Sequence, residues 1–371
     1  MRFPQDVPHL TDGVVTLRAH READLPAILE TCQDRDSVRW TSIPSPYSLE
    51  DAKEFVRHVV PSLWEAEEHF DFAIELAGSF AGTCTLRALP DRRADIGYVA
   101  HPAVRGAGVM ERALRLLLDW GFANRGFETV SWWAHAGNWA SRRVAWKLGF
   151  SCEGPLPRWL PQRGELRDAW FGVLGRNDLR EPRHRWYDAP RIDSTGVVLR
   201  THMEEDLPRI VSAMQDERSR RWLRLPDPYT ASSARDFVFS RTEAMATGTC
   251  VHWAIADPVT DDLLGVVNLF DIEHTVDAEI GFWTHPDTRG RGVMTEACRL
   301  AVRHAFIPEA DGGLGLQRVT AYAATENTAS LHVIESVGFT RYGVERRGVR
   351  NAAGVVSDLV CHDLLADEWS W

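Results

Sequence analysis

Two short stretches of the sequence combine glycine and arginine in a way that suits the binding of an anion. The stretch "HPAVRGAGVMERA" begins at His101, and "HPDTRGRGVMTEA" begins at His285. Glycine lets the backbone turn so that several N–H groups face one concavity, and the N-terminus of a following helix adds partial positive charge. We predict that each turn binds a pyrophosphate. The residues that form the turns are Arg105, Gly106, Ala107, Gly108, Val109 and Met110, and Arg289, Gly290, Arg291, Gly292, Val293 and Met294.

A second pair of stretches carries an asparagine followed by a serine at helical spacing. "NWASRRVAWKLGF" begins at Asn138, and "NTASLHVIESVGF" begins at Asn327. The asparagine amide suits a cofactor amide, and Ser141 and Ser330, one helical turn further on, project on the same side. Asparagine is also a common N-cap and serine is common in a first turn, so residue type alone leaves a purely structural role open.

The order of these landmarks is repeated along the chain. "LRAHREADLPAI" from Leu17 matches "LRTHMEEDLPRI" from Leu199. This spacing of roughly 180 residues indicates duplication of a whole domain rather than a short structural repeat. The stretch "EPRHRWYDAPRID" from Glu181 carries two prolines and clustered charge, as linkers do. The sequence therefore predicts an N-terminal domain at 1–180, a linker at 181–193 and a C-terminal domain at 194–371. The repetition also favours an anion site over a simple helix-initiating turn.

Each copy must position its turn between a strand and a helix. In the first copy, apolar periodicity and capping signals predict strands at 14–19, 69–76, 81–89, 94–101, 129–136 and 167–174, and helices at 21–32, 49–60, 139–148 and from 109 onward. The order is β, α, α, β, β, β, α, β, α, β. The expected fold class is α/β, with an α+β type of mixed sheet that is central, mostly antiparallel and flanked by helices.

Composition limits the classes of function. The chain has 371 residues and a formal net charge of −11, which disfavours a nucleic-acid or anionic-membrane surface and weakly favours amine-bearing partners. The six cysteines show no C-x-x-C pair or metal-ligand spacing, so neither a disulfide framework nor a metal site is expected. There is no membrane-length apolar run or signal-peptide pattern. We expect a soluble cytoplasmic protein.

Taken together, these motifs resemble the GNAT superfamily of N-acetyltransferases, whose motif R/Q-x-x-G-x-G/A binds the pyrophosphate of acetyl-CoA. The opening "LRxHxExDLPxI", the strand "AEIGFW" from Ala278, the "RGxGVM" turn, the "N-x-x-S…GF" segment and the closing "DEW" from Asp367 resemble the RimJ/RimL branch. The resemblance covers both halves nearly end to end. Both copies depart from the motif at its last position, where Met110 and Met294 replace glycine or alanine.

The resemblance implies two tandem domains of the GNAT acyl-CoA N-acyltransferase type, with acetyl-CoA as the cofactor and direct transfer of the acetyl group to a primary amine. In the family an acidic residue on the strand before the turn often serves as the base, which maps onto Glu279 and Asp95. A backbone N–H near Val99 or Trp283 would stabilise the developing oxyanion in a gap between two strands. The tyrosine that is often the general acid in the family is replaced by Ala145 and Ile334.

The leaving thiolate would therefore take its proton from Ser141 or Ser330, from water, or from no enzyme group. In the family the region after the first helix shapes the acceptor pocket. The residues that this implies as substrate contacts are Trp40, Tyr47, Trp222 and Tyr229. The acceptor would be a small-molecule amine or a peptide N-terminus, and the chain a monomer with pseudo-dimeric domains or a homo-oligomer. The second copy matches the branch more closely. The competing hypothesis is that one or both domains bind CoA without catalysis, as a sensor or structural module.

Overall fold

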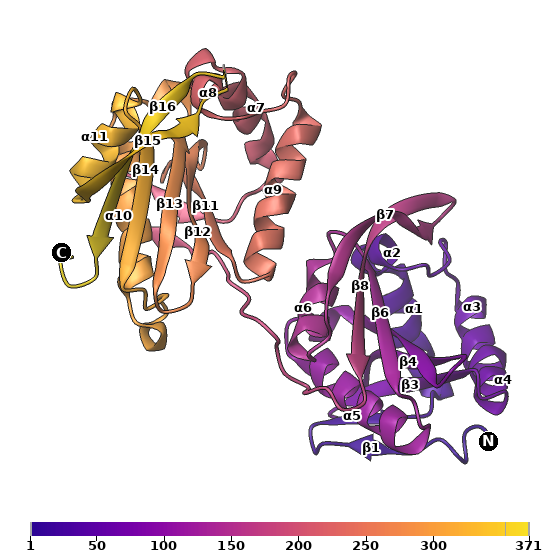
Figure 1. The fold of residues 1–371 in the computed structure, drawn as a ribbon. Coiled ribbons are helices and arrows are strands. Elements are labelled where there is room, and N and C mark those ends of the chain that lie inside the picture. Colours follow the sequence, from indigo (N-terminus) through magenta and orange to yellow (C-terminus); the bar gives the residue numbers. More distant parts are fainter. Residues whose placement is uncertain (1, 353, 370–371) are drawn as a thin grey trace. The chain divides into compact units, whose positions relative to one another are not determined.

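The computed structural model describes residues 2–352 and 354–369, and the chain divides into two compact units, Met1–Arg183 and His184–Trp371. Figure 1 shows the elements of each unit. Each unit builds its own eight-stranded sheet. The predicted α/β class and the tandem arrangement of two such domains are confirmed.

The N-terminal unit has the sheet order β1-β2-β3-β4-β5-β6-β8-β7, in which only β5 and β6 pair in parallel. Its strands are β1 (Leu10–Thr11), β2 (Val15–Arg18), β3 (His69–Leu76), β4 (Ser79–Leu89), β5 (Arg93–Ala100), β6 (Thr129–His135), β7 (Glu153–Gln162) and β8 (Glu165–Gly175). Its α-helices are α1 (Leu25–Gln33), α2 (Arg35–Trp40), α3 (Leu49–Glu54), α4 (Val60–Glu65), α5 (Val109–Asn124) and α6 (Trp139–Lys147).

The C-terminal unit repeats this plan with the order β15-β16-β14-β13-β12-β11-β10-β9, and here β13 and β14 are the parallel pair. Its strands are β9 (Ile192–Asp193), β10 (Val198–Arg200), β11 (Cys250–Ala256), β12 (Leu263–Glu273), β13 (Asp277–Thr284), β14 (Arg318–Ala324), β15 (Thr340–Arg350) and β16 (Val356–Leu365). Its α-helices are α7 (Leu207–Gln215), α8 (Glu217–Trp222), α9 (Ala231–Ala246), α10 (Val293–Phe306) and α11 (Thr328–Val337).

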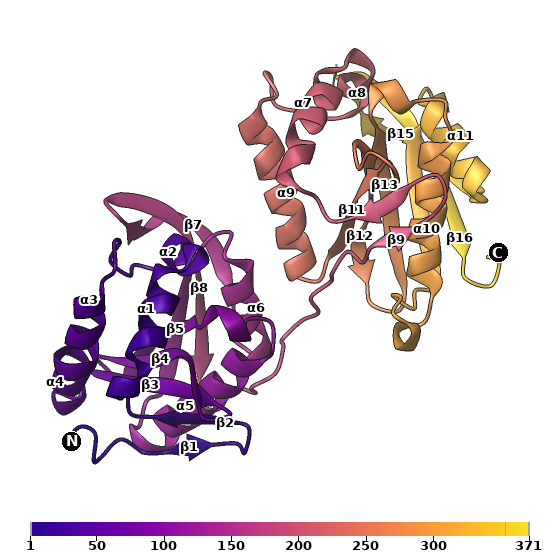
Figure 2. The same cartoon turned by 180° about the vertical axis from the view of Figure 1, so that it is seen from behind.

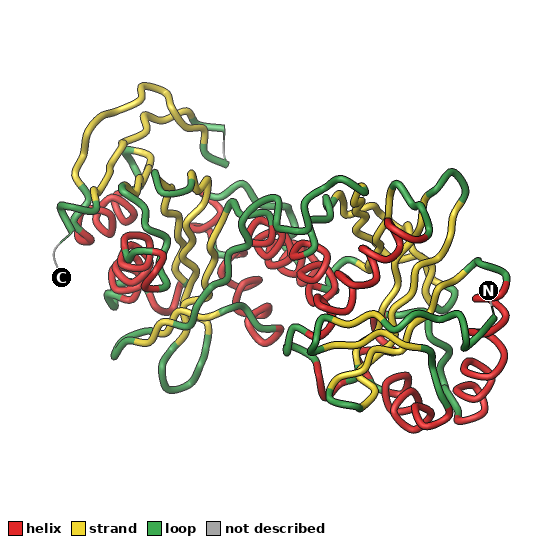
Figure 3. Tube along the Cα trace, turned by 90° about the horizontal axis from the view of Figure 1, so that it is seen from below, coloured by secondary structure: helices red, strands yellow, loops and turns green. Residues whose placement is uncertain are grey.

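Helices cover both faces of each sheet (Figures 2 and 3). In the C-terminal unit, α10 buries an apolar stripe against one face, where Ile280 and Phe282 of β13 point. On the other face, Trp283 of the same strand packs against the cluster formed by α7 and α9. Because side chains alternate along a strand, Glu279 shares the face of Trp283. The carboxylate and the glycine turn of α10 therefore lie on opposite sides of the sheet.

The element order differs from the prediction mainly at the ends of the sheets. The edge strands β1, β7, β9 and β15 and the short helices α2 and α8 were not predicted. The sequence of β7 contains three prolines and that of β15 is mostly polar, and most of the residues of both strands are exposed. Neither strand carries the apolar alternation that marks a half-buried strand, and an edge position is where proline is tolerated. Among the described residues, no helix is long and apolar enough to cross a membrane.

Candidate active site

The two glycine turns have the shape that the sequence predicts. Gly106 and Gly108 have φ of 78° and 74°, and Gly290 and Gly292 have φ of 75° and 77°. Gly108 and Gly292 are the N-cap residues of α5 and α10, and neither has a side chain to cap the first-turn N–H groups. A Cβ placed on any of these four glycines would meet no atom within 4 Å. Each turn thus presents uncapped backbone donors to open space, which suits an anion.

The side chains at the last motif position do not enter that space. Met110 is 8% exposed and Met294 is 4% exposed, and both pack in the core beneath the helix. Val109 and Val293 are buried in the same way. The methionines therefore replace glycine or alanine without covering the donors. Backbone N–H groups, rather than side chains, are what these positions offer a ligand.

The arginine of each turn is ion-paired. Arg105 donates to Asp34 and to Ser37 of α2, and its Nη2–Ser37 Oγ distance is 2.9 Å. Arg289 makes the same contacts with Asp216 and Ser219 of α8, at 2.6 and 3.0 Å. Asp34 and Asp216 are also the N-cap residues of those helices. Both arginines thus tie the turn to the short helix, and their charge is already balanced.

Beyond this pairing, the two turns differ in charge. The C-terminal turn carries the exposed Arg291 where the N-terminal turn has Ala107. The side chain of Arg291 contributes to lowering the pKa of Asp257, and it makes no ion pair within the part of the chain that the structure describes. Arg291 is therefore the cation of this turn that is available to a phosphate.

A gap opens in each sheet next to the turn. The parallel pairing of β5 with β6 covers only Arg93–Ile96, and that of β13 with β14 covers only Asp277–Glu279. Among the described residues, no strand pairs with the remaining halves of β5 and β13 on this side. Such a gap connects the two faces of the sheet, so a ligand bound at the turn on one face can reach the carboxylate on the other.

The register decides which backbone groups line the gap. His101 N–H donates to Ala81 O at 2.9 Å, and His285 N–H donates to Leu264 O at 2.8 Å. Because backbone groups of alternate residues point to the same neighbour, the N–H of Val99 points toward β4 and that of Trp283 toward β12. Neither is the gap-facing donor that was predicted. The N–H groups that face the gap belong to Tyr98, Ala100, Phe282 and Thr284.

The acidic residue of the N-terminal unit is neutralised by its neighbours. Asp95 lies opposite Arg87 on β4, and Arg87 Nη2 donates to Asp95 Oδ2 at 2.6 Å. Ser131 Oγ donates to Asp95 Oδ1 at 3.3 Å. Burial raises the pKa of Asp95, against the opposing effect of the Arg87 guanidinium and the Ser131 hydroxyl. Both carboxylate oxygens of Asp95 therefore already accept hydrogen bonds within the protein.

The corresponding residue of the C-terminal unit has a different environment. Glu279 lies opposite Phe270, and no hydrogen bond or ion pair joins its side chain to another described residue. Burial, together with the nearby Asp271 carboxylate, raises the pKa of Glu279 to about 7. A carboxyl group with this pKa is half ionised near neutral pH, which is the property expected of a general base.

The asparagine of the second motif has the same position in both copies. Asn138 and Asn327 cap α6 and α11 through Oδ1, which accepts from the N–H of Ser141 at 3.2 Å and of Ser330 at 3.4 Å. Nδ2 is the atom that this capping leaves for a ligand.

The hydroxyl of Ser141 is held in a network. It lies 2.8 Å from Tyr98 Oη and 3.2 Å from Trp132 Nε1, and burial raises the pKa of Tyr98 to about 12. In the C-terminal unit Phe282 replaces the tyrosine and Ala321 the tryptophan. The Ser330 hydroxyl consequently makes no side-chain hydrogen bond within the described residues.

The four aromatic residues predicted to contact substrate divide into two pairs. Tyr47 packs against the cluster between α1 and α3, and Tyr229, at 4% exposure, belongs to the corresponding core between α7 and α9. This packing does not support direct substrate contact by either tyrosine. Trp40 lies against Gly137, beside Asn138, and Arg221 stacks over Trp222 with its guanidinium carbon 5.0 Å from the ring centroid. Contact of either tryptophan with substrate stays a prediction.

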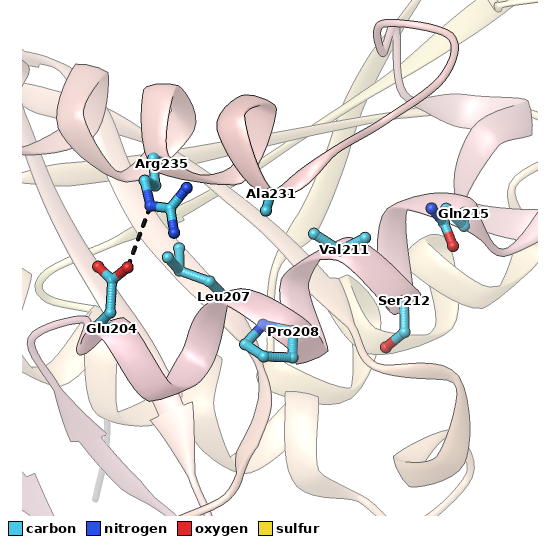
Figure 4. A pocket seen from close by; sticks show the side chains of 8 residues that line it. All are labelled: Glu204, Leu207, Pro208, Val211, Ser212, Gln215, Ala231 and Arg235. Atoms are coloured by element: carbon cyan, nitrogen blue, oxygen red, sulfur yellow. Dashed lines mark hydrogen bonds and ion pairs between the residues drawn. The ribbon is translucent and has the colours of Figure 1, made fainter.

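An open groove of about 600 Å³ lies elsewhere in the C-terminal unit, between α7 and α9 (Figure 4). Arg235 Nε donates to Glu204 Oε1 at 3.1 Å at one end of it. The residues that line it are Glu204, Leu207, Pro208, Val211, Ser212, Gln215, Ala231 and Arg235. None of them belongs to the turn, the gap or the carboxylate, so this groove is separate from the candidate active site. Within the described chain, no cluster of His, Cys, Asp and Glu could hold a metal ion.

Two buried polar groups were missed by the sequence analysis. Asp71 on β3 is 6% exposed, and burial raises its pKa to about 6. At the equivalent place on β11, His252 is 1% exposed, and its Nε2 lies 2.8 Å from Nε2 of His202. Both positions interrupt apolar strands in the sequence, which is the signal that could have identified them. Their cross-strand partners depend on register and could not be read in advance.

Comparison with known proteins is consistent with this geometry. The family model described as "Acetyltransferase (GNAT) domain" matches residues 15–151 and 197–340. "Probable N-acetyltransferase YjcK" of Bacillus subtilis is 33% identical over 146 residues, which cover 39% of this chain and 76% of that protein. "Putative ribosomal N-acetyltransferase YdaF" of the same organism is 36% identical over 108 residues, 29% of this chain and 56% of that protein.

Solved structures of acetyltransferases cover about half of the chain. A probable acetyltransferase is 26% identical, with a TM-score of 0.43, over 48% of this chain and 99% of that one. Mycobacterium smegmatis RimJ in complex with CoA-disulfide is 24% identical, with a TM-score of 0.42, over 47% of this chain and 90% of that one. The family model matches one segment in each unit, and the two segments together span well over half of the sequence. The chain therefore belongs to the GNAT acetyltransferase family and contains two copies of its domain.

Proposed function

We propose that the C-terminal domain transfers the acetyl group of acetyl-CoA directly to a primary amine of a small molecule or a peptide N-terminus, with Glu279 as the general base. The observation that carries this proposal is the contrast between the two carboxylates. Glu279 faces Phe270 and has a pKa raised to about 7, whereas Asp95 is paired with Arg87.

In this proposal the pyrophosphate of acetyl-CoA binds at the turn from Arg289 to Met294. The uncapped N–H groups of α10 donate to it, and Arg291 adds the positive charge that Arg289 cannot supply. The rest of the substrate lies in the gap between β13 and β14. Asn327 Nδ2 and the backbone groups of Phe282 and Thr284 are the donors available to it there.

The acceptor amine approaches from the face that carries Glu279. The amine nitrogen forms a bond to the thioester carbon as the C–S bond breaks, and Glu279 takes the proton that the nitrogen loses, directly or through a water molecule. A gap-facing N–H of β13 stabilises the negative charge that develops on the thioester oxygen. The thiolate takes a proton from the Ser330 hydroxyl or from water. No covalent acyl-enzyme is required.

For the N-terminal domain we propose CoA binding without efficient catalysis. Its glycine turn and gap are equivalent to those of the C-terminal domain, which favours retained binding. The ion pair between Arg87 and Asp95 and the hydrogen bond between Tyr98 and Ser141 occupy the groups that chemistry would need. The relative named as a ribosomal N-acetyltransferase supports a peptide N-terminus as one class of acceptor.

Release of free thiol from acetyl-CoA across a panel of amines and peptides tests the proposal. Replacement of the base, Glu279→Gln, is expected to lower kcat/KM by about 100-fold or more. The matched variant Asp95→Asn is expected to change kcat/KM by less than about twofold, because an ion-paired carboxylate contributes little as a base. If Asp95→Asn abolished turnover and Glu279→Gln did not, the roles assigned to the two domains would be reversed.

A further inference from the structure

Two segments of the C-terminal domain are rich in arginine, although the chain as a whole is acidic. The segments 217–229 and 340–358 together contain eight arginines and four carboxylates, in a protein with a net charge of −11. The corresponding segments of the N-terminal domain, 35–47 and 153–168, contain five arginines and four carboxylates. The excess of positive charge is therefore a property of the domain that we propose to be catalytic.

The two arginine-rich segments meet in space. Arg224, which follows α8, donates Nη2 to the carbonyl oxygen of Arg350 at the end of β15, at 3.3 Å. The N–H of Ala352 in the hairpin donates to the carbonyl oxygen of Arg221 at 3.4 Å. We call the exposed side chains of this joined surface the arginine rim; they are Arg221, Arg224, Arg346, Arg347 and Arg350.

Most of the arginines of the rim form no ion pair with a carboxylate of the described residues. The side chains of Arg346 and Arg347 form no ion pair or hydrogen bond within residues 2–352 and 354–369. Among the described residues, the guanidinium of Arg350 donates only to the carbonyl oxygen of Gly354, at 3.1 Å. The guanidinium of Arg221 stacks over Trp222. Guanidinium groups in this state are suited to bidentate binding of carboxylates.

The backbone at Arg347 gives a second reason to assign this surface a role. Its φ of 57° lies in the left-handed region, which a long side chain rarely adopts, and the register of β15 and β16 shifts between Glu345 and Val349. Asp358 Oδ1 accepts from the N–H of Arg347 at 2.8 Å and holds the bulge. A bulge re-aims the side chain of its extra residue and so sets the direction of the Arg347 guanidinium.

The same bulge is present in the N-terminal domain. Arg158 has a φ of 49°, and its N–H donates to Asp168 Oδ1 at 2.8 Å. In both copies the aspartate carboxylate therefore accepts from the backbone N–H of the arginine. The guanidinium of that arginine is left for other partners. Arg158 offers a matched control in the domain with little excess of positive charge.

The distance from Glu279 to the rim indicates the size of the acceptor. Glu279 lies beside Thr320 of β14, and Thr320 lies beside Asp363 of β16. Asp358, which binds the backbone of Arg347 in the rim, is five residues from Asp363 along β16. Five residues of a strand span roughly 17 Å, and the sideways steps between strands bring the separation to the order of 20 Å. An extended peptide covers that distance in about five or six residues. A small amine would not reach from the carboxylate to the rim.

We infer that the C-terminal domain acetylates the N-terminal amine of an acidic peptide segment, and that the arginine rim binds carboxylates located about four to six residues after that amine. This inference rests on the proposed function, because it needs the amine at Glu279. Arginines on an edge strand also protect it from pairing with other chains, and the experiment distinguishes that role from substrate binding.

The test compares two hexapeptides that differ only in Glu or Gln at the last three positions. With acetyl-CoA at low ionic strength, kcat/KM is expected to be at least tenfold higher for the acidic peptide, through a lower KM, and the preference is expected to shrink as salt is added. The double change Arg346→Gln with Arg347→Asn is expected to reduce the preference to within twofold without altering turnover of the neutral peptide. Arg158→Asn is expected to leave the preference intact.

Asparagine tolerates the left-handed backbone, so Arg347→Asn does not disturb the bulge, and an unchanged circular dichroism spectrum and melting temperature check this. Equal turnover of the two peptides, or a preference that survives the double change, would overturn the inference. So would tight binding of a single-stranded oligonucleotide at the rim without any preference among peptides.

A binding measurement separates this inference from the proposed function. Fluorescence anisotropy of the labelled acidic peptide with the full chain and CoA requires no turnover. Binding that is lost in the double variant supports the rim even if no amine is acetylated, in which case the proposed function alone fails. If the peptide does not bind while amines are still acetylated, the inference about the arginine rim is overturned and the proposed function stands.

Discussion

Arg87 and Asp95 lie opposite one another on β4 and β5 and form an ion pair of 2.6 Å. In the second domain the register is the same, but Phe270 faces Glu279. One cross-strand position therefore separates an ion-paired carboxylate from one that has no ion-pair partner among the described residues and a pKa raised to about 7. The difference between the domains comes from this neighbour as much as from the carboxylates themselves.

Activity is expected to depend on the ionisation of Glu279. Because the base must be deprotonated, kcat/KM is expected to fall about tenfold for each pH step of one below about 7 and to level off above it. Phe270→Arg would place a guanidinium beside the Glu279 carboxylate and lower its pKa. The fall of kcat/KM at acidic pH, the acid limb of the profile, would then shift to lower pH. The maximal kcat/KM would also be smaller, because the base is weaker. A pH profile of kcat/KM measures both effects.

Phe270→Met keeps the position apolar and is the control, for which the acid limb is expected to stay in place. Arg87→Met acts in the other domain and is expected to leave this acid limb in place. An acid limb that did not move in Phe270→Arg would mean that a group other than Glu279 sets it.

The glycine turns predict the number of CoA molecules bound. Titration calorimetry is expected to give two per chain, since both turns have the same backbone angles and open space. Gly292→Glu places a carboxylate where the pyrophosphate would bind and is expected to leave one site and remove turnover. Gly108→Glu is expected to remove the other site and keep turnover.

Each of these changes should also lower the free energy of unfolding by about 1–2 kcal/mol, because glutamate is strained at positive φ. One CoA per native chain, unaffected by Gly292→Glu, would contradict a site at the second turn.

The contact between Arg289 and Asp216 makes a prediction about affinity. Asp216→Asn keeps a good N-cap for α8, since asparagine caps as well as aspartate, but removes the charge that holds Arg289. The freed guanidinium can then reach a phosphate, so the Kd for CoA is expected to fall several-fold, with a steeper dependence on salt. Calorimetry at two salt concentrations measures this.

Asp34→Asn is the equivalent change in the N-terminal domain and should act on that site only. A higher Kd after Asp216→Asn would show instead that the ion pair orders the turn for binding.

Asp71 predicts a pH-dependent stability. Its pKa of about 6 in the folded protein exceeds the usual 3.8, so the folded state binds the proton more tightly, and stability is lost as pH rises from about 4 to 6. Asp71→Asn removes the cost of the buried charge and is expected to stabilise the protein by up to about 3 kcal/mol at pH 8, and by almost nothing at pH 4.

Urea denaturation at the two pH values measures the gain from Asp71→Asn. Destabilisation at pH 8 would show that attraction to Arg87 outweighs the cost of burial.

The parts of the site that lie close together in the sequence were predictable. The turn residues Gly106 and Gly292 are recognisable because their chemistry, a backbone that bends before a helix, is encoded within a few positions. The fold class followed from the repeat and from the apolar periodicity of the central strands. The edge strands β7 and β15 were not predicted, because exposure on both faces removes the alternation of apolar and polar residues that marks a strand.

What could not be predicted depends on register or on distant segments. Arg105 contacts Asp34, 71 residues away, and nothing local to either residue indicates the pair. Whether Val99 or Tyr98 offers its N–H to the gap depends on which residues of β5 pair with β4, and a shift of one residue exchanges them. The same holds for Arg87, whose position opposite Asp95 is fixed only when the sheet forms.

Neither eight-stranded sheet borrows a described strand from the other half of the chain. The boundary between Arg183 and His184 leaves all described strands of each sheet on one side. A substitution beside one carboxylate therefore alters a sheet that does not contain the other carboxylate. After the duplication, each half could accumulate its own substitutions, and residues such as Arg87 and Phe270 record that freedom.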